Sequence, residues 1–437
     1  MHKIHAKSLF LFTFFPPVFY IISYYFHFII ECLFFLINII NIFDRYIDIF
    51  YAIRSFFLLI FSIFCEIIID NNYNIRGDYN MKKLSQKQWA VFLSILVILT
   101  GIILFSGAHD LLWYWIFGLG FGWILQRSHL CFVSATSDPF IMNSTDQFRS
   151  ILIGILFASV GTSAFKFLYG STYNMQGVSA ISIPLVFGAF IFGIGMVLAG
   201  CCSSGMFIRI GEGYLIHLIT FICVLSGYFI ASTHYQLLWA PLIKKAPSVF
   251  LPDYFGWAGG ISINLFIIIL LYVIALRAEK GHTPSESTNY LKGAICLGLL
   301  SSIHVFVLKS PWAVSGAFYW IEDFFKNLFQ GTAYSTLKHA PVTAYGSNIR
   351  NIGLLIGSLI SILFSKRFSI KKIRSGKQVK KSVIGGLLMG YGICIAGGCN
   401  ISSFFIAAAS LSVSGWVFMI ALFAGAFVGI KILYKTM

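Results

Sequence analysis

Two glycine- and cysteine-rich stretches decide the fold: Phe192–Cys202, which reads FGIGMVLAGCC, and Met389–Cys399, which reads MGYGICIAGGC. Aligned in register, they share five identical positions, the last of which is a cysteine. Each stretch ends an apolar segment and leads into another short one. Self-similarity of this kind indicates internal repeats, so the chain is predicted to be built twice.

The composition indicates a membrane protein. Hydrophobic residues make up 58% of the chain, charged residues only 11%, and the mean hydropathy is +0.85. A soluble domain has about a quarter charged residues, whereas a helix crosses a bilayer with about 20 apolar ones. The chain lacks the polar/apolar alternation of an outer-membrane barrel. We therefore predict an all-α, polytopic membrane bundle with spans in Trp89–Gly107, Ser150–Tyr169, Ile181–Gly200, Tyr214–Ala231, Trp257–Leu276, Asn348–Phe364 and Gly415–Leu433.

The net charge of +16 does not indicate a nucleic-acid partner. Lys and Arg collect in the cytoplasmic loops of membrane proteins, and the densest run, Lys366–Lys381, is predicted to be such a loop. Lys82, Lys83 and Lys87 indicate a second cytoplasmic segment. Any remaining positive charge would attract an anionic solute.

Four segments are expected along the chain. Residues 1–80 are rich in Phe, Ile, Tyr and Asn and carry no chemical motif. They are either an extra pair of membrane helices or an over-extended reading frame; we favour the second, with Met81 as the true start. They do not have the form of a secretory signal. The first repeat with a linking helix is expected over 81–276, a polar linker over 277–292 and the second repeat over 293–437.

The two motifs have a physical interpretation as broken helices. Glycines let the backbone leave one helix, and the next short helix presents free N–H groups and partial positive charge, which suit an anion. Non-helical backbone is tolerated at membrane depth only where it is buried in protein or lines a cavity. We therefore expect short broken or re-entrant half-helices that meet at a central constriction, with Cys202 and Cys399 on a polar path. Small residues also serve helix packing, and Cys201 is interpreted in that way.

The remaining cysteines give no sign of redox or metal chemistry. The nine cysteines form no C-x-x-C pair, and an odd count across membrane helices does not suit a disulfide framework. No phosphate-binding loop of the G-x-x-x-x-G-K-S/T type occurs. We expect no metal, no cofactor and no enzyme activity. Structural roles are assigned to Cys32, Cys65, Cys223, Cys296 and Cys394.

A third polar element follows Gly120. Gln126, Arg127, His129 and Cys131 occur together within six residues beside an apolar segment. Ionisable groups inside a membrane are usually functional, so Cys131 is a site candidate, and Arg127 is either a site residue or an interfacial anchor. Elsewhere, Arg209 and Glu212 lie three residues apart, as an ion pair on a helix face would; contact with a passing anion is the other interpretation.

In these three elements the chain resembles the YeeE/YedE family of sulfur-transport membrane proteins, which includes bacterial thiosulfate transporters. The matching residues are Gln126–Asp138, Gly193–Gly213 and Gly390–Ile401. The resemblance covers roughly residues 85–437. It implies an hourglass-like bundle in which Cys131, Cys202 and Cys399 line a central path.

The resemblance implies uptake across the bacterial inner membrane into the cytoplasm, where a small sulfur-carrier protein often receives the sulfur. Around the three cysteines, the motifs extend the candidate substrate path to Gln126, Arg127, Gly200, Arg209, Glu212, Gly398 and Asn400. Three positions depart from the family pattern. The usual R-G-R is Arg127-Ser128-His129, the second glycine of G-G-C is Cys201, and R-D is Ser137-Asp138.

Our hypothesis is that thiosulfate or a similar small sulfur-containing anion passes three protonated cysteines without a covalent bond. Moving a bare dianion through lipid is prohibitive, whereas helix N-termini and weak S–H donors supply serial contacts. A transporter of a selenium compound or another sulfur compound would use the same architecture. A membrane thiol oxidoreductase would need a cysteine pair, for which only Cys201-Cys202 is at hand, and a structural subunit would transport nothing.

Overall fold

Helices account for almost all of the residues that the structure describes. The computed structural model describes residues 85–107, 109–279, 287–318, 342–373 and 375–435. The predictions for residues 1–80 and for a start at Met81 lie outside these ranges. The helices are α4 (Gln86–Gly107), α5 (His109–Ser128), α6 (Phe132–Ile141), α7 (Asp146–Tyr169), α8 (Ser171–Asn174), α9 (Ile183–Ala199), α10 (Ser203–Gly211), α11 (Ile216–His234), η1 (Tyr235–Trp239), α12 (Ala240–Lys244), α13 (Leu251–Ala278), α14 (Ser287–Leu308), α17 (Val342–Phe364), α18 (Gly376–Ala396), η2 (Asn400–Ile406), α19 (Ala407–Ala409) and α20 (Val413–Lys435).

Nine helices in the described part of the chain are long and apolar enough to cross a membrane. They include all seven predicted spans, and α4 and α13 expose long rows of large apolar side chains, as lipid-facing helices do. The all-α, polytopic prediction is confirmed, and the protein is a multi-pass membrane protein. Two of the nine, within α14 and α18, were not predicted as spans. Helix α14 begins at Ser287, inside the predicted linker.

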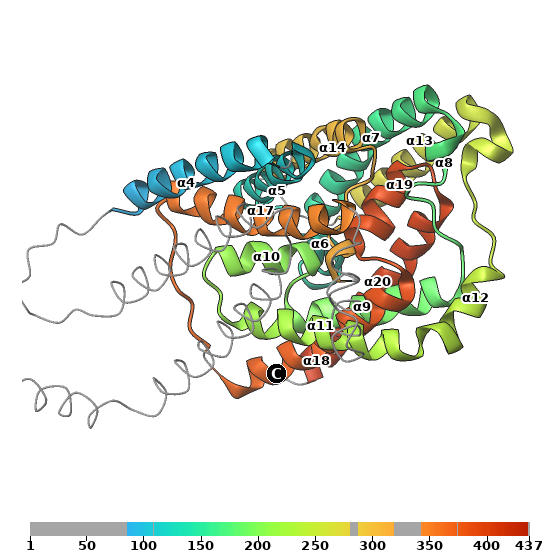
Figure 1. The fold of residues 1–437 in the computed structure, drawn as a ribbon. Coiled ribbons are helices and arrows are strands. Elements are labelled where there is room, and N and C mark those ends of the chain that lie inside the picture. The colour runs from blue at the N-terminus through green and yellow to red at the C-terminus, as the bar shows by residue number, and fades with distance from the viewer. Residues whose placement is uncertain (1–84, 108, 280–286, 319–341, 374, 436–437) are drawn as a thin grey trace, which may run out of the picture. The chain divides into compact units, whose positions relative to one another are not determined.

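Glycines bring the central helices into close contact (Figure 1). Where α9 crosses α18, a Cβ atom on Gly195 would lie 2.7 Å from the carbonyl oxygen of Gly385, and one on Gly392 would lie 2.6 Å from that of Gly188. Real Cβ atoms do not approach other atoms so closely, so these positions need glycine. Small residues of this kind are typical of packed membrane helices. Gly195 and Gly392 of the two motifs therefore serve helix packing, which was one of the two roles considered for the small residues from the sequence.

The helix pairs form two matching sets. In one set α5 packs on α17 and α7 packs on α14; in the other, α9 packs on α20 and α11 packs on α18. If α5, α7, α9 and α11 of the first half correspond to α14, α17, α18 and α20 of the second, exchanging corresponding helices turns the α5–α17 pair into the α14–α7 pair. It likewise turns the α9–α20 pair into the α18–α11 pair. This is the relation that two repeats would have, and the repeat itself stays a prediction.

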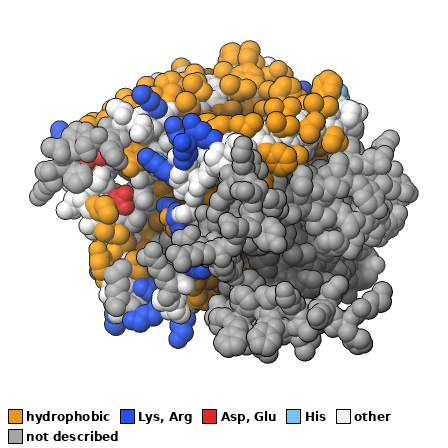
Figure 2. Space-filling model, turned by 90° about the vertical axis from the view of Figure 1, so that its left-hand side faces the viewer, with side chains coloured by type: hydrophobic (Ala, Val, Ile, Leu, Met, Phe, Trp, Pro, Cys, Tyr) orange, Lys and Arg blue, Asp and Glu red, His pale blue; other side chains and the backbone are white. Residues whose placement is uncertain are grey.

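The described parts of the basic segments that were predicted to be cytoplasmic, Lys87 and the Lys366–Lys381 run without residue 374, lie at one end of the bundle, whereas Lys82 and Lys83 lie outside the described residues. The side-chain amide of Gln86 at the start of α4 donates to the carbonyl oxygen of Phe368 at 3.0 Å and accepts from its N–H at 3.3 Å. Phe368 belongs to the lysine-rich segment before α18. We call this end the basic face; it is on the left in Figure 1, and Figure 2 shows it from the front, with Lys and Arg predominating among its visible charged side chains. Helices α8 and α12 lie at the other end.

Candidate functional site

Three short helices begin at three cysteines. Cys131 precedes α6, Cys202 precedes α10 and Cys399 precedes η2, and each has extended backbone angles, with φ between −130° and −95°. η2 continues into α19, so that the third short helix spans Asn400–Ala409. Each cysteine is therefore the N-cap of its helix, next to the free N–H groups and the partly positive end. This is the arrangement that the two glycine–cysteine motifs predicted.

The backbone turns before Cys202 and Cys399 are nearly identical. Gly200 has φ 70° and ψ 16°, and Gly397 has φ 71° and ψ 15°, both in the left-handed region. A Cβ atom on either glycine would meet no other atom within 4 Å. Glycine is thus needed here for its backbone angles and not for space. Before Cys131 the left-handed position is taken by His129, with φ 55°.

The sulfur atoms of Cys202 and Cys399 take part in capping. Cys202 Sγ accepts a hydrogen bond from the backbone N–H of Gly205 at 3.3 Å and lies 3.4 Å from Ser204 Oγ. Ser402 Oγ lies 3.7 Å from Cys399 Sγ, to which it donates, and it accepts from the Cys399 N–H at 3.0 Å. Each of these two thiols therefore contacts a serine hydroxyl and a backbone N–H of its own half-helix, which fixes its position.

The half-helices meet at their starts. Ser203, the first residue of α10, donates a 3.4 Å hydrogen bond to the side-chain oxygen of Asn400, the first residue of η2. Cys131 packs against the same buried cluster that contains Cys202 and Cys399. Cys202 is 1% exposed and Cys399 0%. The starts of α10 and η2 thus meet at a buried point inside the bundle, and the half-buried Cys131 packs against the same cluster.

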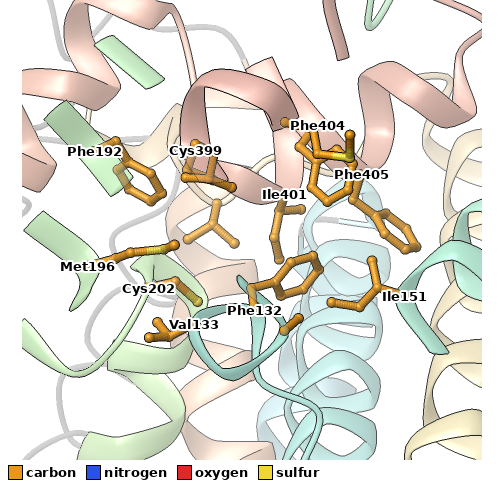
Figure 3. Packing of buried hydrophobic residues seen from close by; sticks show 14 of the residues in the cluster. Phe132, Val133, Ile151, Phe192, Met196, Cys202, Cys399, Ile401, Phe404 and Phe405 are labelled. Atoms are coloured by element: carbon orange, nitrogen blue, oxygen red, sulfur yellow. The ribbon is translucent and has the colours of Figure 1, made fainter. Parts of the chain in front are cut away.

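Apolar side chains surround this meeting point. Figure 3 shows Cys202 and Cys399 among Met196, Phe132 and Ile401, which come from α9, α6 and η2. All of them belong to one buried cluster, against which Cys131 also packs. In this structure the described side chains around Cys202 and Cys399 are tightly packed.

One polar group at the centre has no partner. The side-chain nitrogen of Asn400, Nδ2, is buried and has no hydrogen-bond acceptor among the described residues, and the residue is 0% exposed. A buried N–H group without a partner costs about 1–3 kcal/mol. Such groups in native proteins usually have a reason, and a donor beside two thiols and two helix N-termini is suited to an anion.

A network of side-chain hydrogen bonds joins three of the predicted residues, Gln126, Arg209 and Glu212. Gln126 Nε2 donates to Glu212 Oε1 at 3.5 Å, and Arg209 Nη1 donates to Glu212 Oε2 at 3.2 Å and to Tyr214 Oη at 3.3 Å. The side chain of Glu212 is 8% exposed and that of Arg209 40%. The ion pair of the sequence interpretation is present, and Arg209 keeps part of its guanidinium open to the surroundings.

Arg127 contacts the segment that follows α17. Its side chain is exposed and donates to Ser365 Oγ just after the end of α17, beside the lysine-rich segment. Its position is that of an interfacial residue on the basic face. His129 is also exposed, whereas Asp138 of α6 is half-buried.

Gly200 and Gly398 differ in their surroundings. Gly200 is exposed. A Cβ atom on Gly398 would collide with the hydroxyl groups of Ser402 and Ser403, so glycine is needed there for space. At the equivalent position of the first motif, Cys201 is accommodated with 1% exposure. Among the described residues, no three His, Cys, Asp or Glu side chains come together as metal ligands.

Three residues at the centre were missed by the sequence interpretation. Ser402 caps Cys399 from the third position of the helix, which is the spacing of a capping box and a usable signal. Ser315 Oγ lies 3.1 Å from Ser402 Oγ, and Gln147 of α7 accepts the Cys131 N–H at 2.8 Å. Gln147 lies 16 residues after Cys131 and Ser315 lies 87 residues before Ser402, and no local pattern indicates either contact.

Comparison with known families identifies the family of this chain. Residues 127–428, which include all three cysteines and their half-helices, match the sulphur transport family. The chain belongs to this family. The recognition of a YeeE/YedE sulfur-transport protein from the three motifs is confirmed.

Curated relatives agree with the match. A thiosulfate transporter of Spirochaeta thermophila is 27% identical over 343 residues, which cover 73% of this chain and 97% of the relative. A thiosulfate transporter of Escherichia coli is 23% identical over 335 residues, which cover 72% of this chain and 92% of the relative. A probable transporter of E. coli, YedE, is 30% identical over 170 residues, which cover 38% of this chain and 40% of the relative.

Proposed function

We propose that this protein takes up thiosulfate, or a small sulfur-containing anion like it, by passing the anion along Cys131, Cys202 and Cys399. The observation that carries the proposal is that each of these cysteines is the N-cap residue of a short half-helix and that all three half-helices pack in one buried cluster. Two relatives that align with most of this chain are named as thiosulfate transporters, which supports the substrate.

The contacts suit an anion with hard oxygens and one soft sulfur. Its oxygens would accept hydrogen bonds from the free N–H groups of the half-helices and from Nδ2 of Asn400, which has no other acceptor among the described residues. Neutral thiols are weak S–H donors, which hold the anion too weakly to trap it. Serial weak sites are what conduction requires. The relay needs no covalent bond and no metal.

The apolar cluster around the thiols would act as a gate. Met196, Phe132 and Ile401 are buried at the meeting point, so an anion passes only when these side chains move apart. Narrow apolar constrictions close to ions because water leaves them. The structure thus has the features of a closed state, in which the thiols are held ready on their half-helices.

We further propose that the protein lies in the bacterial inner membrane with its basic face in the cytoplasm. The lysine-rich segment before α18 and the start of α4 meet at that face, in agreement with the positive-inside rule. Uptake would therefore deliver the anion at the basic face, where a small sulfur-carrier protein would receive the sulfur.

Uptake by purified protein in liposomes tests the proposal. Labelled thiosulfate should accumulate with the unaltered protein, and uptake by Cys202→Ala or Cys399→Ala should fall at least about tenfold. Cys296→Ala is the matched control, because Cys296 is exposed on α14, and it should transport normally. Normal rates in both Cys202→Ala and Cys399→Ala would end the relay idea, and competition with sulfite, sulfide and selenium compounds defines the substrate.

A further inference from the structure

A cavity of about 610 Å³ lies next to the cysteine centre on the basic face. Its walls come from the end of α9, the end of α10, the start of α11 and the start of α18. Gly200, two residues before Cys202, forms part of the wall. Among the lining residues, only Gly200 and Arg209 belong to the candidate substrate path.

The charged side chains that line the cavity are all basic. They are Arg209, Lys377 and Lys381, and none of the described residues in its wall is acidic. Glu212 binds Arg209 through one guanidinium nitrogen only, Nη1. A recess with positive charge on several sides concentrates anions.

The lysines of this wall sit at an unfavourable place on their helix. Lys377 and Lys381 belong to the first two turns of α18, which begins at Gly376 and has no acidic residue in its first turn. Lys377 lies in the first turn, where a positive side chain opposes the helix dipole by about 0.3–1 kcal/mol; Lys381 lies in the second turn, beyond most of this effect. A negatively charged ligand in the cavity would offset both the dipole and the repulsion among the three cations.

A buried histidine in the same wall has an unused nitrogen. His217 lines the cavity and is 6% exposed, and its Nδ1 has no hydrogen-bond partner among the described residues. Ring contact with Tyr214 holds the imidazole, with 5.9 Å between the ring centroids. A buried imidazole nitrogen without a partner is unusual, and in the N–H tautomer it is a hydrogen-bond donor suited to an oxyanion.

From the cavity, its cations and His217, we propose that this recess is a binding site for a small tetrahedral oxyanion of the sulfate and thiosulfate class. Its volume exceeds that of the anion, so the ligand is held with part of its hydration shell and exchanges readily. The role of the site rests on the proposed function: it receives the anion that has passed Cys202 and holds it at the basic face before release.

The test is equilibrium binding of sodium thiosulfate to the full protein in nanodiscs, by isothermal titration calorimetry at constant ionic strength. The double variant Lys377→Gln/Lys381→Gln should bind about tenfold more weakly. Lys380→Gln is the matched control, because Lys380 is exposed on the same helix but does not line the cavity, and its affinity should stay within about twofold. Equal affinity in the double variant, or an equal loss in Lys380→Gln, would overturn the proposal.

Two further measurements separate this site from the relay. His217→Phe removes the imidazole with both lysines in place and should also weaken binding; unchanged affinity would refute the part assigned to His217. The titration is repeated with Cys202→Ala, where binding in the cavity should persist, and its loss would place the site at the thiols instead. Binding that depends on Lys377 and Lys381 in a protein without thiosulfate uptake would refute the proposed function and leave the site standing.

Discussion

Gly397 offers a prediction with a magnitude that follows directly from the structure. Its backbone has φ 71° and ψ 15°, and a Cβ atom there would meet nothing within 4 Å. Gly397→Ala therefore changes only the backbone preference, and a left-handed conformation costs an L-residue about 1–2 kcal/mol. We expect the free energy of unfolding to fall by this amount. Uptake should fall as well, because relaxation of the turn moves Cys399, two residues further on.

Two substitutions control for other effects of a methyl group. Gly376→Ala also adds a Cβ atom in open space, but Gly376 has no positive φ, so stability should be unchanged or rise by up to about 1 kcal/mol. Gly397→Asn should lose less stability than Gly397→Ala, because asparagine enters the left-handed region more easily. Gly390→Ala should lose more, because its Cβ atom would collide with the backbone of Val224 in α11.

The assay is reversible unfolding in mixed micelles by titration with sodium dodecyl sulfate, followed by tryptophan fluorescence and paired with liposome uptake for each variant. The reasoning would be refuted if Gly397→Ala were as stable as Gly376→Ala. It would also be refuted if Gly397→Asn were no more stable than Gly397→Ala, since the cost would then not come from the left-handed backbone.

Two buried polar networks give further predictions. Asn264 accepts from the indole N–H of Trp416 at 3.1 Å and donates to Ser159 at 3.2 Å, so Asn264→Leu should lower the free energy of unfolding by about 1–3 kcal/mol; an unchanged value in the micelle titration would contradict this. Arg350 bonds His304 at 2.9 Å and the carbonyl oxygen of Ala313 at 2.6 Å. Arg350→Lys replaces the planar guanidinium and its several N–H donors with a single ammonium group. It should lower the free energy of unfolding by about 1–3 kcal/mol. A decrease below about 0.5 kcal/mol would show that the second hydrogen bond of the guanidinium does not contribute.

The broken helices could be predicted from the sequence because their chemistry is local. A glycine, a small residue and a cysteine at the end of an apolar segment specify a left-handed turn and a new helix start. The motifs around Gly200 and Gly397 accordingly fold with the same angles. For that reason the sequence was sufficient to predict that Cys202 and Cys399 lie at the starts of short helices.

Residues that act through distant contacts could not be predicted in the same way. Arg127 was considered for the site because it stands near Cys131 in sequence, but its partner Ser365 is 238 residues away and lies beside the basic face. Gln147 and Ser315 reach the centre only because α7 and the segment after α14 pack there. Neighbouring position in the sequence does not determine which way a side chain points in a bundle.

Two membrane-spanning helices, α14 and α18, were not predicted as spans because their first turns consist of polar residues. Helix α18 starts with three lysines in its first two turns, and α14 starts with polar residues within the predicted linker. Each becomes apolar only further on, where close packing of glycines on neighbouring helices, such as Gly386 on Thr220, replaces apolar bulk. The mean hydropathy of the α18 span, 1.3, is the lowest of the nine, whereas that of the α14 span, 1.9, equals that of the predicted span in α7.

Protection of the thiols by substrate tests the central claim most directly. Protein in liposomes is treated with a small alkylating reagent during uptake, with and without saturating thiosulfate, and alkylation of each cysteine is measured by mass spectrometry. The account predicts that thiosulfate slows alkylation of Cys131, Cys202 and Cys399 and leaves that of Cys296 unchanged. Alkylation of the three thiols at the same rate with and without thiosulfate would mean that the anion does not pass them.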